Sequence, residues 1–409
     1  MRRGLDTWLV MLCLSRAFMT LIFLTYAASL TVLQSAWGMS ATAAGSISTG
    51  FQFGFAISLF GCSWLADRIS ARRVFLASAA LAAVTSLAFA LFARSYLSGL
   101  ILYTLVALSQ GGTYTTAIML MADRYGPERR GAALGWLIAS SSFGSACSLL
   151  IAGLTLSGGN YPLTFMVTSA GPLIGLVLGW FALRSTPNMV HHRGGDLHFR
   201  AEVLKNPQAT RLITSYIFHN WELLAMWAWT PAFMTASLAA SGSSAGRAVA
   251  GGAFVASSFH VMGLLASSTM GRLSDHLGRR RVLVALAAIS TVCSFTIGWL
   301  VSAHAAIVVA VGALYAFTAL GDSPVLSTAL TEAVRPAYLG AALALRSFLG
   351  FGAGAIAPLV FGAVLDATNP RGVAPATWGW AFTALGLGGL IATACAYGMR
   401  PATGTPRSS

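Results

Sequence analysis

Two stretches of the sequence, 208 residues apart, decide the fold. Ser63–Arg73 reads SWLADRISARR, and Gly271–Arg281 reads GRLSDHLGRRR. The offset places Asp67 on Asp275 and brings the basic residues of the two stretches into register. Each stretch follows one long apolar run and precedes another. Self-similarity at a fixed distance is the signature of a duplicated architecture.

A second pair of segments repeats at nearly the same distance. Pro127–Leu134 reads PERRGAAL and Pro336–Leu343 reads PAYLGAAL, an offset of 209 residues. Both pairs lie between apolar runs at equivalent places along the chain. Two independent repeats with almost one offset predict two similar halves, residues 1–183 and 209–399.

The composition is that of a chain surrounded by lipid. Apolar residues make up 56% of the sequence and charged residues 9%, whereas soluble proteins carry about 25% charged residues. A helix needs about 20 apolar residues to cross a bilayer. We therefore predict an all-α membrane protein with twelve transmembrane helices, six in each half. The predicted helices span residues 8–33, 41–65, 74–93, 97–121, 131–155, 161–183, 209–237, 249–271, 282–303, 305–330, 340–365 and 375–399.

Lysine and arginine are distributed unequally between the two ends of these helices. One side holds the N-terminus, the linker 184–208 and the tail 400–409, and it carries twenty lysines and arginines in all. The other side carries three. Cytoplasmic loops carry the excess of positive charge. We therefore predict a multi-pass protein of the cell (inner) membrane with both termini in the cytoplasm. The net charge of +14 belongs to these short loops, so no nucleic-acid partner is predicted.

The cysteines do not indicate a metal site or a disulfide. All five lie in apolar stretches, far apart and without CxxC spacing, where a small apolar filler is the simpler interpretation. The adjacent His191 and His192 lie in the polar linker and are interpreted as solvated. No cofactor is predicted.

Together these features resemble the major facilitator superfamily of secondary transporters, over nearly the whole chain. That family's Gly-x-Leu-x-Asp-x-x-Gly-Arg-Arg signature is complete at Gly271–Arg280. In the first half, Ser63 and Ser70 replace its two glycines. The resemblance implies two six-helix halves related by a pseudo-two-fold axis, transport by alternating access, and function as a monomer.

The repeated acid and arginines predict a cytoplasmic gate. Asp67 and Asp275 can each accept charge-assisted hydrogen bonds from arginines or from a helix N-terminus. Such a contact would hold the halves together in one state and release them in the other. The alternative is a positively charged loop with an incidental acid. The residues assigned to the gate are Asp67, Arg68, Arg72, Arg73, Asp275, Arg279, Arg280 and Arg281.

Six ionisable residues fall inside predicted helices. A charge at the centre of a bilayer costs at least about 2.5 kcal/mol, so these residues are functional candidates. None lies in the third, sixth, ninth or twelfth helix, the four that face lipid in the resembled family. The six are Arg16, His219, Glu222, His260, Asp322 and Arg346.

The charges suggest how transport is coupled. With both arginines and both acids ionised the set is neutral, and protonating one acid leaves a net positive charge that attracts an anion. Guanidinium groups bind carboxylates through two parallel hydrogen bonds. The sequence thus predicts proton-coupled uptake, or exchange, of a small carboxylate-like anion. Glu222, Asp322 and His219 are assigned to proton coupling, and substrate binding to Arg16, Arg346, His260, Gln52, Gln110 and Trp229.

Other interpretations stay open at this point. Either arginine can snorkel to the cytoplasmic surface, and the acids can be structural partners of the arginines. Gln52 overlays His260 in the repeat, which suggests a facing pair across the halves. A proton-driven exporter of drugs or hydrophobic metabolites is the alternative function. It is disfavoured because Ala107 stands where such exporters carry an arginine before Gln110-Gly111, and because the fifth helix lacks their Gly-Pro pair. A polytopic membrane enzyme is less favoured, since no hydrolase or metalloprotease motif is present.

Overall fold

The computed structural model describes residues 6–189, 203–370 and 376–399, and every regular element in these ranges is helical. The predicted all-α class is confirmed. The linker residues His191 and His192, as well as the tail 400–409, lie outside the described residues. The elements are α1 Thr7–Met19, η1 Thr20–Ile22, α2 Thr25–Trp37, α3 Ala41–Ile69, α4 Ala71–Phe92, α5 Tyr96–Arg124, α6 Pro127–Leu156, α7 Tyr161–Leu183, α8 Pro207–Ala240, α9 Ala245–Leu277, α10 Arg279–Ile297, η3 Gly298–Leu300, α11 Ala305–Ala333, α12 Pro336–Thr368 and α13 Gly379–Tyr397.

These helices make twelve passes along the bundle, because α1, η1 and α2 together form the first. Within the described ranges, eleven passes are long and apolar enough to cross a membrane. The remaining pass, α5, is as long as its neighbours but carries several hydroxyl and amide side chains. Most of these polar groups are buried inside the protein, so they lower the hydropathy of α5 without facing lipid.

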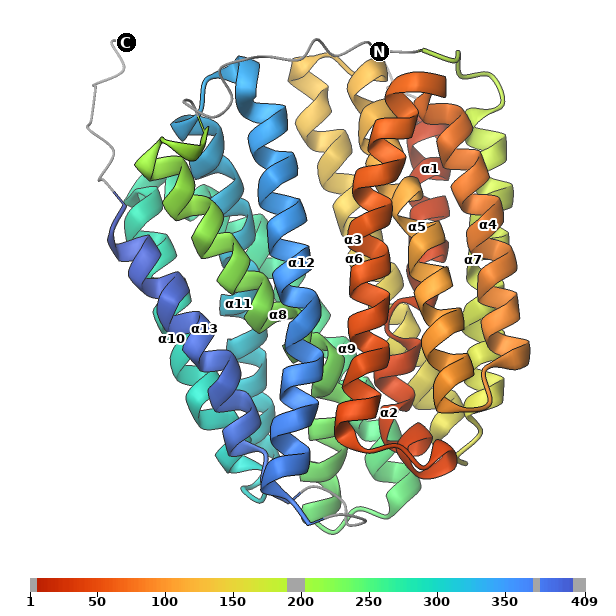
Figure 1. Ribbon diagram of the computed structural model, residues 1–409, viewed down its shortest axis with the longest axis vertical. Helices are drawn as coiled ribbons and strands as arrows, with labels where there is room; N and C mark the ends of the chain where they lie inside the picture. The colour runs from red at the N-terminus through yellow and green to blue at the C-terminus, as the bar shows by residue number, and fades with distance from the viewer. Residues whose placement is uncertain (1–5, 190–202, 371–375, 400–409) are drawn as a thin grey trace.

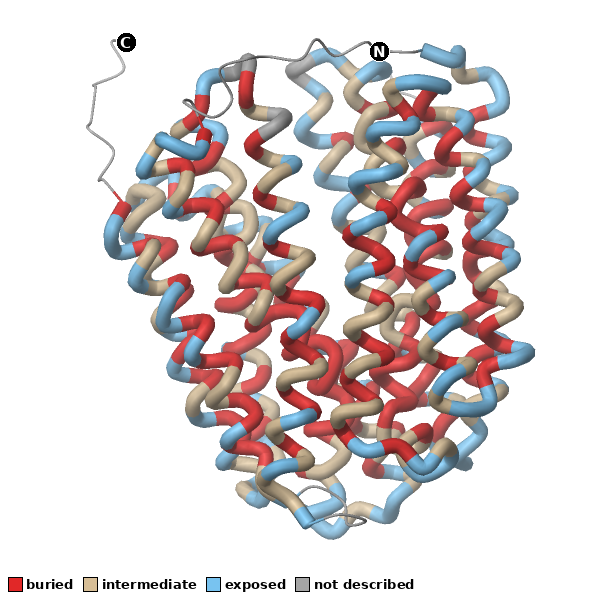
Figure 2. The backbone as a smooth tube through the Cα atoms, in the orientation of Figure 1, coloured by how far each residue is buried: buried red, intermediate tan, exposed pale blue. Residues whose placement is uncertain are grey.

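The passes form two groups that pack side by side (Figure 1). One group holds α1 to α7 and the other α8 to α13. The main contacts between them are α3 with α12 and α6 with α9, a pairing expected if the two groups are related by a two-fold axis. Buried positions line the inner faces and are densest away from the chain termini (Figure 2).

The first pass is broken in its middle, where the sequence predicts one continuous helix. The backbone changes to a 3-10 turn at Thr20–Ile22 and resumes as α2 at Thr25. Two side chains of α5 bind carbonyl oxygens near the break: Gln110 Nε2 donates to the oxygen of Met19 at 2.9 Å, and the Tyr103 hydroxyl to that of Phe23 at 2.6 Å. Such replacement partners are what allow a membrane helix to break. The polar face of α5 therefore stabilises the irregular first pass.

The repeated Asp-and-Arg loops are shorter than expected. Asp67 lies in the last turn of α3 and Asp275 in that of α9, and a single residue separates each helix from the next. That residue is Ser70 in the first half, with φ +118°, and Gly278 in the second, with φ +90°. Positive φ favours glycine, which explains a glycine in the motif at this position. Ser70 adopts it with its side chain engaged, since Oγ accepts from the backbone N–H of Arg73 at 3.3 Å.

The second repeat marks two helix starts. The helices α6 and α12 begin at Pro127 and Pro336, four residues earlier than predicted at each site. Proline is favoured in the first turn of a helix, because its missing N–H has no intrahelical partner there and its φ is already helical.

Close contacts between the two groups gather at the end of the bundle opposite the termini. A Cβ atom at Gly45 would collide with the carbonyl oxygen of Pro358, and one at Gly362 with that of Ala41. At the same end, the Asp366 carboxylate accepts hydrogen bonds from the backbone N–H groups of Ala41 at 2.9 Å and Thr42 at 2.7 Å. The Thr42 hydroxyl adds a third at 2.6 Å. An acid of α12 thus caps the N-terminus of α3, whose first N–H groups have no intrahelical partner.

We expect reciprocal stability effects at the two one-residue turns. Ser70→Gly should stabilise the protein by about 1 kcal/mol, since a side chain at positive φ costs roughly 1–2 kcal/mol and replacing a Ser cap by Gly costs only a few tenths. Gly278→Ser should destabilise it by a similar amount. Thermal unfolding in detergent measures both, and shifts of the same sign would contradict the strain argument.

The cap made by Asp366 predicts local opening when it is removed. Asp366→Ala leaves the N–H groups of Ala41 and Thr42 without their acceptor, and hydrogen bonds to charged groups contribute about 1.5–3 kcal/mol. Hydrogen–deuterium exchange of these amides should become about 10- to 100-fold faster. Asp366→Asn keeps one carbonyl acceptor, so its amide exchange rates should lie between those of the wild type and those of Asp366→Ala. Unchanged protection in Asp366→Ala would show that the cap does not hold this end together.

Candidate functional site

Arg16 is buried on α1, one turn before the break, and is 4% exposed. Its guanidinium donates to two hydroxyls, Ser141 Oγ at 2.8 Å and Thr113 Oγ1 at 3.0 Å. It also lies 4.9 Å from the ring centroid of Tyr114 and 5.4 Å from that of Phe23. Its contacts come from α5 and α6 as well as from its own pass. The guanidinium therefore points into the protein and does not reach the cytoplasmic surface.

Arg346 on α12 has a similar environment in the other half. It is 9% exposed, donates to Ser327 Oγ at 2.8 Å, and lies 4.1 Å from the ring centroid of Tyr216. Its Nε is buried with no hydrogen-bond partner among the described residues. Tyr114, which packs on Arg16, interacts electrostatically with Arg346 and Tyr216 as well. Tyr114 is thus close enough to interact with both arginines.

Neither arginine is paired with an acid in the described part of the chain. The contacts given above are hydroxyls and aromatic rings, and both positive charges are held away from water. Burying a charge without a counter-charge is costly, and removing one partner of a buried pair costs about 3–5 kcal/mol for the same reason. The two arginines thus form a positively charged centre that an anion can neutralise.

Asp322 is paired with a histidine instead. His219 Nδ1 lies 2.9 Å from Asp322 Oδ1, and His219 Nε2 lies 2.9 Å from the hydroxyl of Ser323. Both partners are buried, His219 on α8 and Asp322 on α11. His219 is thus the direct neighbour of Asp322, and both were assigned to proton coupling.

Glu222 lies apart from the arginines. It is 5% exposed, and its Oε1 accepts a hydrogen bond at 3.0 Å from Ser290 on α10. Tyr315 of α11 also interacts with it, and a Cβ atom at Gly389 of α13 would come within 3.2 Å of its Oε2. This carboxyl group is enclosed within the second half, among residues of α8, α10, α11 and α13.

A cavity of about 170 Å³ lies beside Arg16. Its walls include Phe23 and Ser141 of the first half and Trp227 and His260 of the second. The rings of Trp227 and His260 stack at 3.9 Å with an interplanar angle of 18°, and His260 Nε2 is buried without a hydrogen-bond partner. The cavity thus combines a cation, hydroxyls and flat aromatic surfaces.

Gln52 and His260 do not lie at one interface. Gln52 is on α3, which packs on α12, whereas His260 is on α9, which packs on α6. The repeat relates the two positions by symmetry, and symmetry places them at two different contacts between the halves.

Two other residues assigned to substrate binding have structural partners. The Trp229 indole N–H donates to the carbonyl oxygen of Pro358 at 3.0 Å, and its ring stacks on Phe361 at 5.2 Å. It is buried in the aromatic core shared by α8, α12 and α13. The amide N–H of Gln110 donates to the carbonyl oxygen of Met19, whereas Gln110 Oε1 is buried without a hydrogen-bond partner among the described residues.

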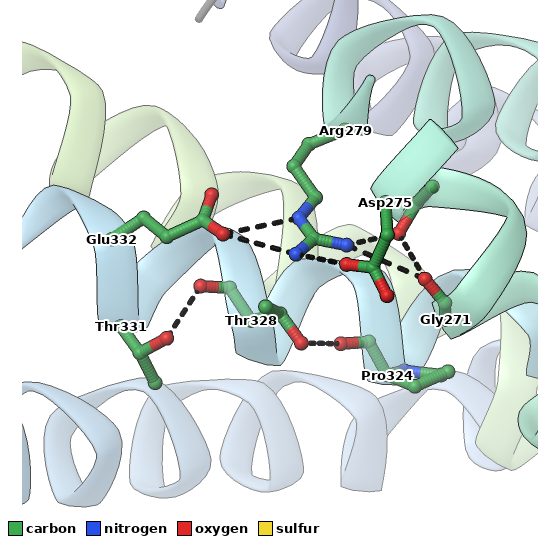
Figure 3. A network of polar contacts seen from close by, with 8 residues as sticks. Gly271, Asp275, Arg279, Pro324, Thr328, Thr331 and Glu332 are labelled. Carbon is green, nitrogen blue, oxygen red and sulfur yellow. Dashed lines mark hydrogen bonds and ion pairs between the residues drawn. The ribbon is translucent and has the colours of Figure 1, made fainter. Parts of the chain in front are cut away.

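The arginines of the predicted gate bind helices of their own half. Arg279 lies 2.5 Å from Asp275 and 3.0 Å from Glu332 of α11 (Figure 3). In the same half Arg280 donates to the carbonyl oxygen of Tyr397 at 2.9 Å. Arg72 of the first half donates to the carbonyl oxygen of Arg184 at 3.2 Å. These bonds fasten each turn to the adjacent helices, and a link between the halves stays a prediction for Asp67, Arg68, Arg73 and Arg281.

Sequence reasoning missed Tyr216, Ser141 and Ser327, which surround the two arginines. Tyr216 precedes His219 by three residues and so shares its helix face, a signal that was available. Hydroxyls in membrane helices usually bond their own backbone, so nothing local distinguished the two serines. In the described residues no group of three or more His, Cys, Asp or Glu side chains is placed to hold a metal ion.

Comparison with known proteins agrees with this architecture. The sequence model of the Major Facilitator Superfamily matches residues 10–256 and 224–409, which together span most of the chain. The chain belongs to the Major Facilitator Superfamily. It is accordingly a multi-pass membrane protein and a secondary transporter rather than an enzyme.

Solved structures of other superfamily members share its fold. The chain is similar to a D-xylose–proton symporter, with TM-score 0.78, 15% identity, and coverage of 97% of this chain and 98% of the other. It is also similar to the nucleoside transporter NupG, with TM-score 0.73, 14% identity and coverage of 97% and 99%. A bacterial homologue of the human lysosomal transporter Spinster, solved in an inward-facing and unoccupied conformation, gives TM-score 0.74, 17% identity and coverage of 96% and 97%. No curated protein matches the sequence. At identities this low, the three structures show that the fold is shared and nothing about the substrate.

Gln110 offers a test of structural against substrate-binding roles. Gln110→Leu leaves the carbonyl oxygen of Met19 buried without its donor, and we expect a loss of about 1–3 kcal/mol in stability. Thermal unfolding in detergent measures the loss. An unchanged unfolding temperature together with altered transport would instead favour contact with the substrate.

Proposed function

We propose that this superfamily member moves a small carboxylate-like anion across the cell (inner) membrane by alternating access. The observation that carries the proposal is the pair of buried arginines, one in each half, each held by hydroxyls and a tyrosine ring. In a low-dielectric interior an uncompensated guanidinium favours an anionic ligand strongly. A carboxylate fits because it accepts two parallel hydrogen bonds from one guanidinium.

The placement of the arginines suits alternating access. Arg16 belongs to the first half and Arg346 to the second, so an anion between them contacts both halves at once. A ligand that binds both halves favours states in which they come together and is released when they separate. Neutralising the two charges is also what makes the loaded carrier less costly to close.

Proton coupling is part of the proposal. The pair His219–Asp322 lies in the same half as Arg346, with hydroxyls of α11 serving both sites. A proton bound there adds one positive charge near the anion. Glu222 of α8, whose carboxylate accepts a hydrogen bond from Ser290 of α10, is a candidate for a second proton site. Exchange of one anion for another needs no proton and is the other form of the same proposal.

The direction of opening follows from the proposed orientation. Counting lysine and arginine supports termini in the cytoplasm, and the close contacts at Gly45, Gly362 and Asp366 lie at the opposite end. On that orientation the external side is closed in this structure. The bonds within the Asp275–Arg279–Glu332 cluster are then part of a cytoplasmic gate that rearranges when this side closes.

The test is anion counterflow in proteoliposomes. We expect Arg346→Gln to reduce counterflow of small carboxylates at least about 100-fold, since it removes a charge-assisted bidentate contact. Arg346→Gln should not lower the unfolding temperature of the empty protein, because it also removes an uncompensated buried charge. The matched control is Arg247→Gln, which removes an equal charge from an exposed residue whose described bond is to Ser244.

Two outcomes would contradict the proposal. One is counterflow in Arg346→Gln equal to that of the wild type. The other is an absence of anion flux in the wild type combined with outward transport of hydrophobic cations, which would favour the exporter.

A further inference from the structure

We propose that Tyr216 is the positioning residue that couples proton binding at His219–Asp322 to anion binding at Arg346. The inference rests on the proposed function and adds to it the side chain through which one site affects the other. The role proposed for Tyr216 comes from where its ring lies.

The ring of Tyr216 touches both sites. It lies one helical turn before His219 on α8, and the two rings are 5.5 Å apart with an interplanar angle of 34°. The guanidinium carbon of Arg346 lies 4.1 Å from the same tyrosine ring. Cations within about 6 Å of an aromatic centroid are attracted to it. Tyr216 therefore contacts both a titratable pair and a fixed cation through one ring.

The opposite wall is built by α11 in the same order. Ser323 binds His219 Nε2 at 2.9 Å, and Ser327, one turn later, accepts from Arg346 at 2.8 Å. Asp322 completes the proton site at 2.9 Å from His219 Nδ1. Two helices thus hold two adjacent polar sites, and α8 places a tyrosine where they meet.

The ring is packed tightly enough to exclude water. Tyr216 is 8% exposed, and a Cβ atom at Gly350 on α12 would come within 2.6 Å of its Cδ1. Glycine at that position leaves room for the ring. Charges separated by protein interact several-fold more strongly than charges separated by water, so an intact ring lets the proton site and the anion act on each other.

Few other charges face this pair. Glu222, on the same helix, interacts electrostatically with both His219 and Asp322. The helix α9 carries His260, which stacks on Trp227 at the cavity. The helix α12 carries Arg346, which packs on Tyr216. The helices α2 and α13 contribute no Asp, Glu, Lys, Arg or His. Glu222 is therefore the further group that can titrate close to the pair.

The direction of coupling follows from the charges. With His219 protonated and Asp322 ionised the pair is neutral, and one more proton makes it positive. The added charge strengthens anion binding at Arg346, and by linkage the bound anion strengthens proton binding by the same factor. Anion affinity should therefore fall as pH rises. If water replaces the ring, the interaction is screened and affinity should become independent of pH.

Two variants of Tyr216 test this role. Tyr216→Phe keeps the ring and should keep coupling. Tyr216→Ser removes the ring and admits water, so we expect the ratio of accumulation driven by an imposed proton gradient to carboxylate counterflow to fall at least about tenfold below that of the wild type. The control is Tyr397→Ser, which removes a tyrosine packed on Arg280 at 4.9 Å outside the site and should leave both activities unchanged.

Each result bears on the inference. A fall in the ratio of accumulation to counterflow in Tyr216→Ser, with the wild-type ratio kept in Tyr216→Phe, supports it. Full accumulation in Tyr216→Ser overturns it while leaving the proposed function intact, as does equal loss of counterflow and accumulation in both variants, which would mark Tyr216 as merely structural. An absence of carboxylate counterflow in the wild type would overturn the proposed function and this inference with it.

Discussion

Two guanidinium groups held away from water form the constraint on which this structure depends. Arg16 and Arg346 each donate hydrogen bonds to hydroxyls, but their charges are not cancelled by an acid among the described residues. The hydroxyls and tyrosine rings lower the cost of burial without removing the attraction for an anion. In the proposed function, this uncompensated charge is the source of affinity for an anion.

The polar face of α5 shows how the surrounding fold supports this site. Thr113 accepts a hydrogen bond from Arg16. Gln110 and Tyr103 donate hydrogen bonds to the backbone carbonyl oxygens that are left without helical partners where the first pass breaks. Because backbone groups in a membrane need partners inside the protein, α5 has to be polar where the first pass is irregular. The same residues lower the mean hydropathy of α5 below that of the other membrane-spanning passes.

The halves are similar in backbone but not in chemistry. Asp322, His219 and Glu222 all belong to the second half, and the first half contributes Arg16 with hydroxyls and rings. The closure at the end opposite the termini is also one-sided, since Asp366 caps α3 from the α12 side. Alternating access needs only that the two halves move against each other, so the chemistry can be concentrated in one of them.

The sequence by itself determined the fold, because apolar runs of bilayer length and a repeat at one offset leave few other architectures. It also identified the ionisable residues inside the membrane, since a charge stands out in an apolar helix whatever its contacts. It could not say which of them meet. Helix spacing places Glu222 and His219 on one face of α8, yet α10 and α11 draw them to different partners, Ser290 and Asp322. Gln52, Gln110 and Trp229 look alike as polar or aromatic candidates until the packing of other helices assigns their hydrogen bonds. Only the tertiary structure placed the Tyr216 ring beside both His219 and Arg346, because Arg346 reaches that ring from a different helix.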